Sequence, residues 1–323
     1  MPELPEVETI ARGLAKLVTG DVIESVWLGS KPQTFKSAPE QIAATLQSKR
    51  IGEVRRVGKH IVFELEGRAS GFRRQASGVS DEKAGVRSQE SGVRKGKKAA
   101  GKSARATRAG ATPAGATQAG ATPAGAKAQW VVHLGMTGRM VVGAPETEIE
   151  KHTHAIVKLA SGRELRFVDA RRFGRLSVAR GFEAGGTEPL EIEVEPFIAL
   201  FRGRKTPIKS ALLNQKLLRG VGNIYADESL FRAGIRPRRR AASLTREDLG
   251  RLFITVKEVL QEAIALGGSS ISDYVDADGE EGFFQLELRV YGREGEPCRV
   301  CRSPVKRVVI AGRSSHYCAK CQK

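Results

Sequence analysis

The first residues of the chain carry groups that can attack an electrophilic carbon. Pro2 follows Met1, and a small second residue permits removal of the initiator methionine. Pro2 would then present a secondary amine with a pKa near ~8, so that a useful fraction is neutral at neutral pH. The Schiff base of such an amine is a charged iminium, an electron sink suited to breaking adjacent bonds. Glu3 can exchange protons beside it, although proline and glutamate also favour the first turn of any helix.

The last residues of the chain carry a metal-binding pattern. Two Cys-x-x-Cys pairs are separated by 16 residues, the spacing of a zinc ribbon or finger, and together they can supply four thiolates to one tetrahedral ion: Cys298, Cys301, Cys318 and Cys321. Four reduced thiols without metal are the alternative. Val305–Ile310 and Ser314–Tyr317 predict a hairpin between the pairs, with Arg313 near its exposed tip. His316 is expected to be structural, because four cysteines complete the site.

A glycine-rich turn at 220–223 is a candidate phosphate site. Successive backbone N–H groups at the start of the next helix, with the Asn223 amide, can bind a phosphate, but such a turn can also simply break a helix. Arg204 and Lys209 lie upstream and strengthen the phosphate interpretation. Together with a zinc hairpin bearing Arg313, these residues predict a nucleic-acid groove.

The elements that must position these groups differ between the two parts of the chain. Val7, Ile10, Leu14 and Leu17 predict an opening helix that ends at Gly20. Strands are predicted over 61–65, 130–134, 155–159, 164–168 and 175–178, so the N-terminal domain is mainly antiparallel β. After about 187 the pattern becomes helical, with an apolar stripe over 208–217, a helix over 224–231 and a helix capped by Thr245.

The chain has 323 residues and a net charge of +18, which favours a polyanionic partner. Residues 70–128 hold 12 Lys and Arg against 3 Asp and Glu and are rich in Gly and Ala, so we expect a disordered basic insertion between two neighbouring strands. No apolar run approaches the ~18 residues that span a bilayer, and the acidic start lacks the features of a signal peptide. Membrane and secreted proteins are therefore disfavoured.

Five motifs follow one another along the chain: Met1-Pro2-Glu3-Leu4-Pro5-Glu6-Val7-Glu8-Thr9, His133-Leu134-Gly135-Met136-Thr137-Gly138, Asp169-Ala170-Arg171-Arg172-Phe173-Gly174, Gly220-Val221-Gly222-Asn223-Ile224-Tyr225-Ala226 and the four-cysteine tail. In this order they resemble bacterial formamidopyrimidine-DNA glycosylase, over all of the chain except 70–128. The resemblance implies an α+β fold: an N-terminal antiparallel β-sandwich with flanking helices (1–186), a helix-two-turn-helix domain (187–290) and a zinc finger (291–323). Ala170 departs from the family's usual proline, which puts the stiffness of the Arg171 loop in doubt.

The resemblance also implies roles for individual residues. Pro2 would attack C1′ of the damaged nucleotide, Glu3 would assist ring opening, and Lys59 and Arg313 would complete the catalytic set, although Lys59 could otherwise be an ordinary surface lysine. Met136 and Phe173, which could otherwise be core residues, would fill the gap left by the extruded base. Phosphate contacts would come from His152, Arg171, Arg204, Lys209, Asn223 and Arg313. The segment from Gly267 to Tyr274 would cover the flipped base.

The implied function is excision of oxidised purines, 8-oxoguanine and formamidopyrimidines, with lyase cleavage of the abasic strand. One alternative is an endonuclease VIII type acting on oxidised pyrimidines, which the Leu4 opening and the Asp169–Gly174 motif disfavour. Another is a zinc-dependent DNA-binding protein without catalysis, which Pro2, Glu3 and Lys59 together disfavour. We expect a monomer with one zinc ion, acting on damaged double-stranded DNA in the bacterial cytoplasm, on the nucleoid.

Overall fold

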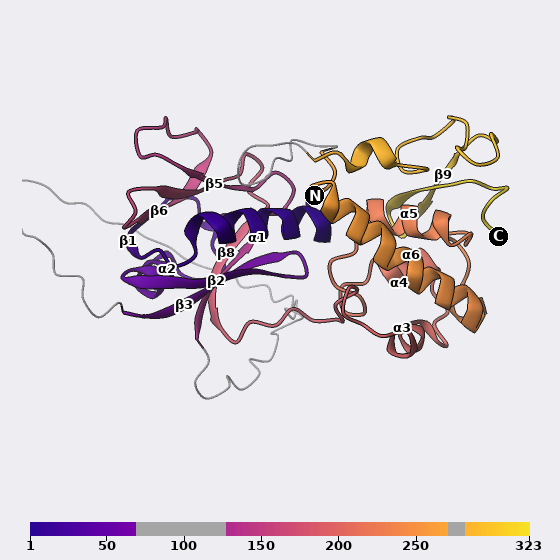
Figure 1. Ribbon diagram of the computed structural model, residues 1–323, viewed down its shortest axis with the longest axis horizontal. Helices are drawn as coiled ribbons and strands as arrows, with labels where there is room; N and C mark the ends of the chain where they lie inside the picture. Colours follow the sequence, from indigo (N-terminus) through magenta and orange to yellow (C-terminus); the bar gives the residue numbers. More distant parts are fainter. Residues whose placement is uncertain (69–126, 271–281) are drawn as a thin grey trace, which may run out of the picture. The chain divides into compact units, whose positions relative to one another are not determined.

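The structure is a computed structural model that describes residues 1–68, 127–270 and 282–323 (Figure 1). Within this part, no helix is both long and apolar enough to cross a membrane. The insertion up to residue 126 and the Ile271–Tyr274 part of the predicted covering loop lie outside the described residues.

Ten strands and six α-helices, with three short 3-10 helices, make up the described chain. Their order is α1 (Leu4–Val18), β1 (Ile23–Leu28), η1 (Pro32–Thr34), α2 (Pro39–Leu46), β2 (Lys49–Val57), β3 (His60–Arg68), β4 (Ala128–His133), β5 (Arg139–Gly143), β6 (Thr153–Leu159), β7 (Glu164–Val168), β8 (Arg175–Arg180), α3 (Val194–Phe201), α4 (Ile208–Leu212), α5 (Asn223–Arg232), η2 (Ala241–Ser243), α6 (Arg246–Ala265), η3 (Phe284–Glu287), β9 (Lys306–Ile310) and β10 (Arg313–Tyr317).

The N-terminal part is a sandwich of two four-stranded antiparallel sheets, which confirms the antiparallel β domain predicted from the strands and the sandwich implied by the resemblance. One sheet has the order β1-β6-β7-β5 and the other β2-β3-β4-β8. Their apolar faces share a core with α1, in which Phe63 stacks on Trp130 at a centroid distance of 4.8 Å. Val7, Ile10 and Leu14 of α1 are buried there because they repeat at helical spacing. The sandwich therefore fixes α1, whose first turn follows Pro2 and Glu3.

The strands on either side of the basic insertion pair directly with each other. In the β3–β4 ladder Phe63 lies opposite Trp130 and Leu65 lies opposite Ala128. The prediction that the insertion is an overgrown hairpin loop is confirmed for its two flanking strands. The predicted boundary is corrected at residue 128, because Ala128 already belongs to β4, and Lys127 before it forms an ion pair with Glu66.

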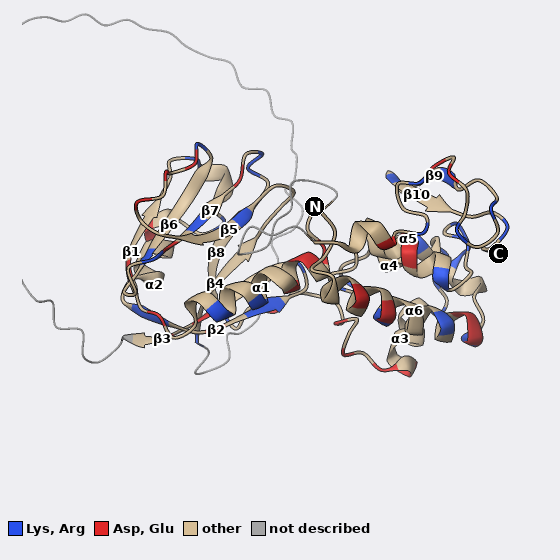
Figure 2. Cartoon of the chain, turned by 45° about the horizontal axis from the view of Figure 1, so that its top comes forward, with Lys and Arg blue, Asp and Glu red and all other residues tan. Residues whose placement is uncertain are grey.

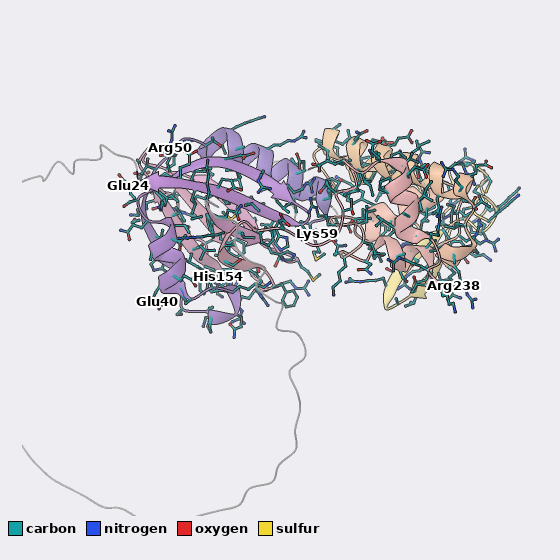
Figure 3. All side chains as sticks on the ribbon, turned by 90° about the horizontal axis from the view of Figure 1, so that it is seen from below. Glu24, Glu40, Arg50, Lys59, His154 and Arg238 are labelled. Atoms are coloured by element: carbon teal, nitrogen blue, oxygen red, sulfur yellow. The ribbon has the colours of Figure 1, made fainter. Side chains whose placement is uncertain are left out.

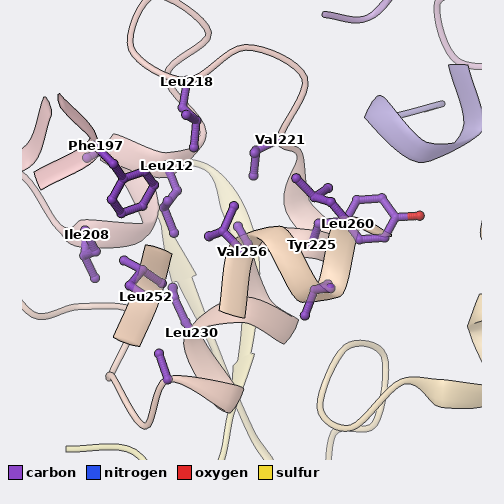
Figure 4. Close-up of a cluster of buried hydrophobic side chains, with 14 of the residues drawn as sticks. Phe197, Ile208, Leu212, Leu218, Val221, Tyr225, Leu230, Leu252, Val256 and Leu260 are labelled. Carbon is purple, nitrogen blue, oxygen red and sulfur yellow. The ribbon is translucent and has the colours of Figure 1, made fainter. Parts of the chain in front are cut away.

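The second core is helical and lies among α3, α4, α5 and α6 (Figure 4). The apolar stripe predicted over 208–217 is not one helix, since α4 ends at Leu212 and the chain turns through Asn214. Thr245 caps α6 as predicted, and its hydroxyl accepts a hydrogen bond from the Asp248 N–H. Leu4, the first residue of α1, also packs in this core, so the start of α1 is held by the helical part.

The C-terminal residues form the predicted two-stranded hairpin. Arg313 of β10 lies opposite Ile310 of β9, and the two-residue turn between them has positive φ at both Ala311 and Gly312. Val290 and Phe231 pack with the cysteines in a small separate core. The hairpin is thus anchored to α5 through Phe231.

Candidate active site

Glu3 is the centre of a buried contact between the start of α1 and the start of α5. The Leu4 N–H donates to the Gly220 carbonyl at 3.0 Å, and the Ile224 N–H donates to Glu3 Oε1 at 3.3 Å. A Cβ on Gly222 would lie 2.1 Å from Glu3 Cδ. Only glycine therefore leaves room for this carboxylate. The glycine-rich turn is more than a helix break, because it seats a side chain that is distant in sequence.

Burial changes the acid–base properties of Glu3. Desolvation is the main cause of a rise in its pKa to about 7. The positive charge of Lys59 opposes this rise, and the negative charge of Glu6 adds to it. A carboxyl group in this range can exchange protons at neutral pH. Pro2, the preceding residue, is only partly buried, so the acid lies beside a group that a substrate can reach.

Lys59 lies at the tip of the β2–β3 hairpin (Figure 3), where Gly58 has a φ of +61°. Only 9% of its surface is exposed, so it is not the ordinary surface lysine of the alternative interpretation. Burial lowers its pKa, the negative charges of Glu3 and Glu6 oppose this, and the positive charge of Arg313 lowers it further. Glu3 and Arg313 therefore both act on Lys59 electrostatically.

Glu6 links three segments next to this site. Its Oε2 accepts the Glu3 N–H at 2.7 Å, and its Oε1 accepts the Ser269 N–H at 2.9 Å and the Tyr225 hydroxyl. The i, i+3 spacing of Glu3 and Glu6 was the sequence signal for the first of these contacts. The other two join residues more than 200 positions apart and had no such signal.

Asn223 begins α5 and has a neighbour that sequence reasoning missed. Burial raises the pKa of the Tyr291 hydroxyl, and the adjacent Asn223 side chain opposes the rise. Arg313 is exposed at the start of β10, and its positive charge also acts on Tyr291. An amide, a phenol and a guanidinium are thus gathered near Glu3, and all three can donate hydrogen bonds to phosphate oxygens.

Lys209 is not placed as a free phosphate ligand. Its side chain has no exposed surface, and its Nζ lies 2.7 Å from Asp227 Oδ1 and 2.7 Å from the Ser314 carbonyl oxygen. The sequence could not show this, because the carboxylate lies on α5 and the carbonyl on β10. Arg204 is exposed on the loop after α3, where its side chain donates to the Leu200 carbonyl.

Two loops of the sandwich bring together Met136, Arg171 and Phe173. Met136 and Phe173 are 38% and 49% exposed, so they are not the core residues of the alternative interpretation, and the Arg171 guanidinium lies 5.3 Å from the Phe173 ring centroid. Buried Asp169 joins the loops: it accepts the Thr137 hydroxyl at 2.6 Å and the Gly174 and Arg171 N–H groups.

His152 lies beside this pair of loops. Its side chain is exposed, and its carbonyl oxygen accepts the Asp169 N–H at 3.0 Å. Asp169 holds the Arg171 loop with its own carboxylate, so the loop has an anchor that does not depend on the residue at position 170. His152, Arg171 and Phe173 therefore lie on one connected set of loops.

His133 is a second residue that sequence reasoning left unassigned. It ends β4 opposite His60 in the ladder, with ring centroids 5.0 Å apart. Burial lowers the pKa of His133 to about 4, and the nearby charge of Lys59 adds to the shift. The neutral imidazole thus forms part of the surroundings of Lys59.

The four cysteines have the geometry of a tetrahedral metal centre. Their sulfur atoms all lie within 4.8 Å of one another, and two of the separations are 3.9 Å (Cys298–Cys321) and 3.4 Å (Cys301–Cys318). Ligands about 2.3 Å from a tetrahedral zinc ion would be about 3.8 Å apart, so the set fits zinc. His316 lies outside the cluster, and its ring contacts Tyr291.

The comparisons with known proteins agree along the whole chain. Residues 1–176 match the formamidopyrimidine-DNA glycosylase N-terminal domain, residues 186–275 its H2TH domain, and residues 295–323 the zinc finger found in FPG and IleRS. The chain belongs to the formamidopyrimidine-DNA glycosylase family. It is thus a base-excision-repair DNA glycosylase of a bifunctional glycosylase and apurinic/apyrimidinic lyase family.

Relatives of similar length support this assignment. The formamidopyrimidine-DNA glycosylases of Solibacter usitatus and Desulfitobacterium hafniense are 39% and 37% identical, with 100% of both chains covered. The MutM (Fpg) structure of Thermus thermophilus is 36% identical, has a TM-score of 0.73 and covers 99% of this chain and 98% of that one. A complex of Lactococcus lactis Fpg with abasic-site DNA is 29% identical, with a TM-score of 0.75 and 99% of each chain covered.

Proposed function

We propose that the chain removes oxidised purines from duplex DNA and cleaves the resulting abasic strand through a Schiff base on Pro2. The observation that carries the proposal is the buried carboxyl group of Glu3, held against the backbone of Gly222 beside Pro2 and within the electrostatic reach of Lys59. Related Lactococcus lactis complexes contain Fapy-dG DNA and abasic-site DNA, which are a substrate and an intermediate of such a reaction.

In the proposed mechanism, removal of Met1 frees the Pro2 nitrogen to attack C1′. The bond between C1′ and the base breaks, the base leaves with the electron pair, and the proton lost from the Pro2 nitrogen goes to the departing base. Glu3, about half protonated at neutral pH because burial raises its pKa to about 7, gives its proton to the sugar ring oxygen, and the ring opens to an iminium. Loss of the C2′ proton sends electrons to the iminium nitrogen, and the C3′–O bond breaks with release of phosphate. A second elimination removes the C4′ proton and breaks the C5′–O bond.

The remaining site residues bind and orient the DNA in this proposal. Met136 and Phe173 enter the duplex where the base leaves, and Arg171 bonds the orphaned partner base. His152, Arg204, Asn223 and Arg313 bind phosphates, and Arg313 also assists the elimination steps by neutralising the departing phosphate. Lys59 stabilises the negative charge that develops on the departing base. Lys209 supports Arg313 from below the surface instead of binding phosphate directly.

The finger would hold one zinc ion through its four cysteines, and the ion would supply structural cross-linking only. The 29 residues of the finger, 295–323, carry seven Lys and Arg against one acidic residue, and Figure 2 shows basic residues around β9 and β10. Such a surface favours a polyanion. We propose that the protein acts as a monomer on damaged duplex DNA, in the cytoplasm on the bacterial nucleoid.

Borohydride trapping on lesion duplexes tests the nucleophile. The protein with Pro2 at its terminus should become covalently linked to DNA containing 8-oxoguanine opposite cytosine, while a form that retains Met1 should not. Pro5→Ala is the matched control, because Pro5 lies in the same helical turn but cannot form the iminium. Equal trapping by the Met1-retaining form would exclude Pro2 as the nucleophile.

Substrate preference is tested by excision rates on matched duplexes. Rates on 8-oxoguanine and formamidopyrimidine should exceed those on oxidised pyrimidines. Oxidised pyrimidine duplexes are included to test the alternative activity of the endonuclease VIII type, because a Lactococcus lactis Fpg complex contains an oxidised pyrimidine. Faster excision of oxidised pyrimidines would replace the proposed substrate class by that one.

A further inference from the structure

A buried ion pair lies beneath the finger, outside the groups that touch DNA in the proposed mechanism. Lys209 on α4 and Asp227 on α5 each have 0% side-chain exposure, and Lys209 Nζ lies 2.7 Å from Asp227 Oδ1. An ion pair that is taken fully out of water pays a desolvation penalty, and removal of one partner leaves an uncompensated buried charge. A pair in this position therefore calls for an explanation beyond general stability.

Both members of the pair also bond the backbone of β10. Lys209 Nζ donates to the Ser314 carbonyl oxygen at 2.7 Å, and Asp227 Oδ2 accepts the His316 N–H at 2.9 Å. Ser314 and His316 are two residues apart, so their backbone groups face the same side of the strand. The cation meets the carbonyl and the anion meets the N–H, so each charge matches the backbone dipole that it contacts.

The edge that the pair occupies is the free edge of a two-stranded sheet. Within residues 1–68, 127–270 and 282–323, β10 pairs only with β9, and the alternation of an antiparallel ladder leaves every second residue of β10 with backbone groups directed away from β9. Lys209 and Asp227 take the place that a third strand would have there. The hairpin is thereby fixed to α4 and α5 by charge-assisted hydrogen bonds, which are stronger than neutral ones.

Arg313 comes directly before Ser314 and is the first residue of β10. Its exposed guanidinium affects Lys59, Lys209 and Tyr291 electrostatically. A shift of β10 along or away from α5 would move Arg313 with it, because one peptide unit separates Arg313 from the bonded carbonyl. Placement errors of about 1 Å can cost roughly a hundredfold in rate.

We propose that Asp227 is a positioning residue for Arg313: with Lys209 it binds the free edge of β10 and sets where the Arg313 guanidinium meets the phosphates of the cleaved strand. The inference rests on the proposed role of Arg313 in elimination. Asp227 touches neither the sugar nor the base, so base excision by Pro2 and Glu3 is expected to be largely independent of it.

The test compares Asp227→Asn, Arg313→Ala and the double variant in single turnovers on 8-oxoguanine duplexes. Asparagine can still accept the His316 N–H but leaves the Lys209 charge unpaired. Asp227→Asn should slow the elimination steps about tenfold to a hundredfold while excision changes less than about threefold. The double variant should be no slower in elimination than Arg313→Ala alone, because both changes remove the same contact.

Lys209→Met with Asp227→Asn keeps the test informative if the single variant fails to fold, because no buried charge is then left unpaired. It removes the bond to Ser314 and should show the same selective loss. Zinc content, measured on every variant, should stay at the level of the unmodified protein. Asp227→Glu, which keeps the charge, should recover part of the elimination rate.

The outcomes separate this inference from the proposed function. Two results would show a general structural role for Asp227 and overturn the positioning inference. In one, Asp227→Asn slows excision and elimination equally. In the other, the slowing of elimination in the double variant equals the product of the slowing in Asp227→Asn and in Arg313→Ala. An Arg313→Ala variant with unchanged elimination would instead remove the proposed role of Arg313, and the inference would fall with it.

Discussion

Substitution of Glu3 by glutamine should make the stability of the protein depend differently on pH. The folded-state pKa of Glu3 is raised by burial from 4.5 to about 7. Between these values the folded protein binds more protons than the unfolded chain, so stability falls as the pH rises. The contribution of Glu3 is therefore fully present below about 4.5 and is lost as the pH rises through about 7. At about 1.36 kcal/mol per pKa unit, the full span is about 3.4 kcal/mol.

The measurement is the difference in free energy of unfolding between the unmodified protein and Glu3→Gln, from urea denaturation at several pH values. From pH 5 to pH 8 the unmodified protein should lose about 2.5 kcal/mol of unfolding free energy relative to Glu3→Gln, because the Glu3 carboxyl group titrates and the glutamine amide does not. Any pH-independent cost of the new amide cancels in the shift. The zinc finger is common to both proteins and cancels as well.

Glu8→Gln is the matched control, because Glu8 lies on the same helix and its pKa is shifted in the opposite direction. Burial raises the pKa of Glu8, but hydrogen bonds and charges from Arg56 and Arg12 outweigh it and lower the pKa overall. The contribution of Glu8 is lost only as the pH falls below about 4.5, so this variant should show almost no change between pH 5 and pH 8 and a change of opposite sign below that range. A Glu3→Gln difference that stays flat within about 0.5 kcal/mol from pH 5 to 8 would refute the burial argument.

The same group should control the pH dependence of catalysis. With a pKa of about 7, the protonated fraction of Glu3 falls from about 0.9 at pH 6 to about 0.1 at pH 8. The neutral fraction of the Pro2 amine rises over the same range, so the quantity to compare is the single-turnover excision rate of the unmodified protein divided by that of Glu3→Gln, in which the Pro2 titration cancels. This ratio should fall about tenfold from pH 6 to pH 8. A ratio that is equal at both pH values would show that Glu3 does not deliver the proton.

Three further perturbations address other parts of the molecule. Asp169→Ala removes the hydrogen bonds from Thr137, Arg171 and Gly174. Affinity for lesion DNA should fall about tenfold in a binding titration, with zinc content unchanged. Unchanged affinity would show that the two loops keep their positions without Asp169. Cys318→Ser should lose zinc by metal analysis and lower DNA affinity, while the thermal unfolding of the sandwich, which has its own core, stays nearly unchanged. Replacing 70–126 by a short turn removes eleven basic residues and should make the slope of log affinity against log salt shallower at an unchanged excision rate; an unchanged slope would mean that the segment does not bind DNA.

Local patterns predicted those elements whose side chains follow one clear period. The strands that flank the insertion were found because each is a run of β-branched and aromatic residues, and the pairing of Phe63 with Trp130 confirmed their adjacency. β1 was missed, since only Ile23 is buried in its six residues and the period is faint. The hairpin of the finger was predicted almost to the residue, because its turn and its cysteine spacing constrain both strands.

The sequence proposed the site as a set of residues but not as a set of contacts. The chemistry of the first residues suggested Pro2 and Glu3, and the family resemblance suggested Lys59, while the depth at which Lys59 lies depends on how the two parts of the chain pack around it. Lys209 was misplaced for the same reason, since its partner Asp227 lies on another helix and its burial leaves no local trace in the sequence.

The close approach of Gly222 to Glu3 has a bearing on how related sequences are sorted. Position 222 never touches DNA in the proposed mechanism, yet even a methyl group there would occupy the space of the Glu3 carboxyl group. A homologue that keeps Pro2 and Glu3 but carries a larger residue at position 222 would have to displace the acid from the start of α5. Such a chain should be classed as a candidate pseudoenzyme, although its N-terminal sequence alone would lead to its classification as an active enzyme.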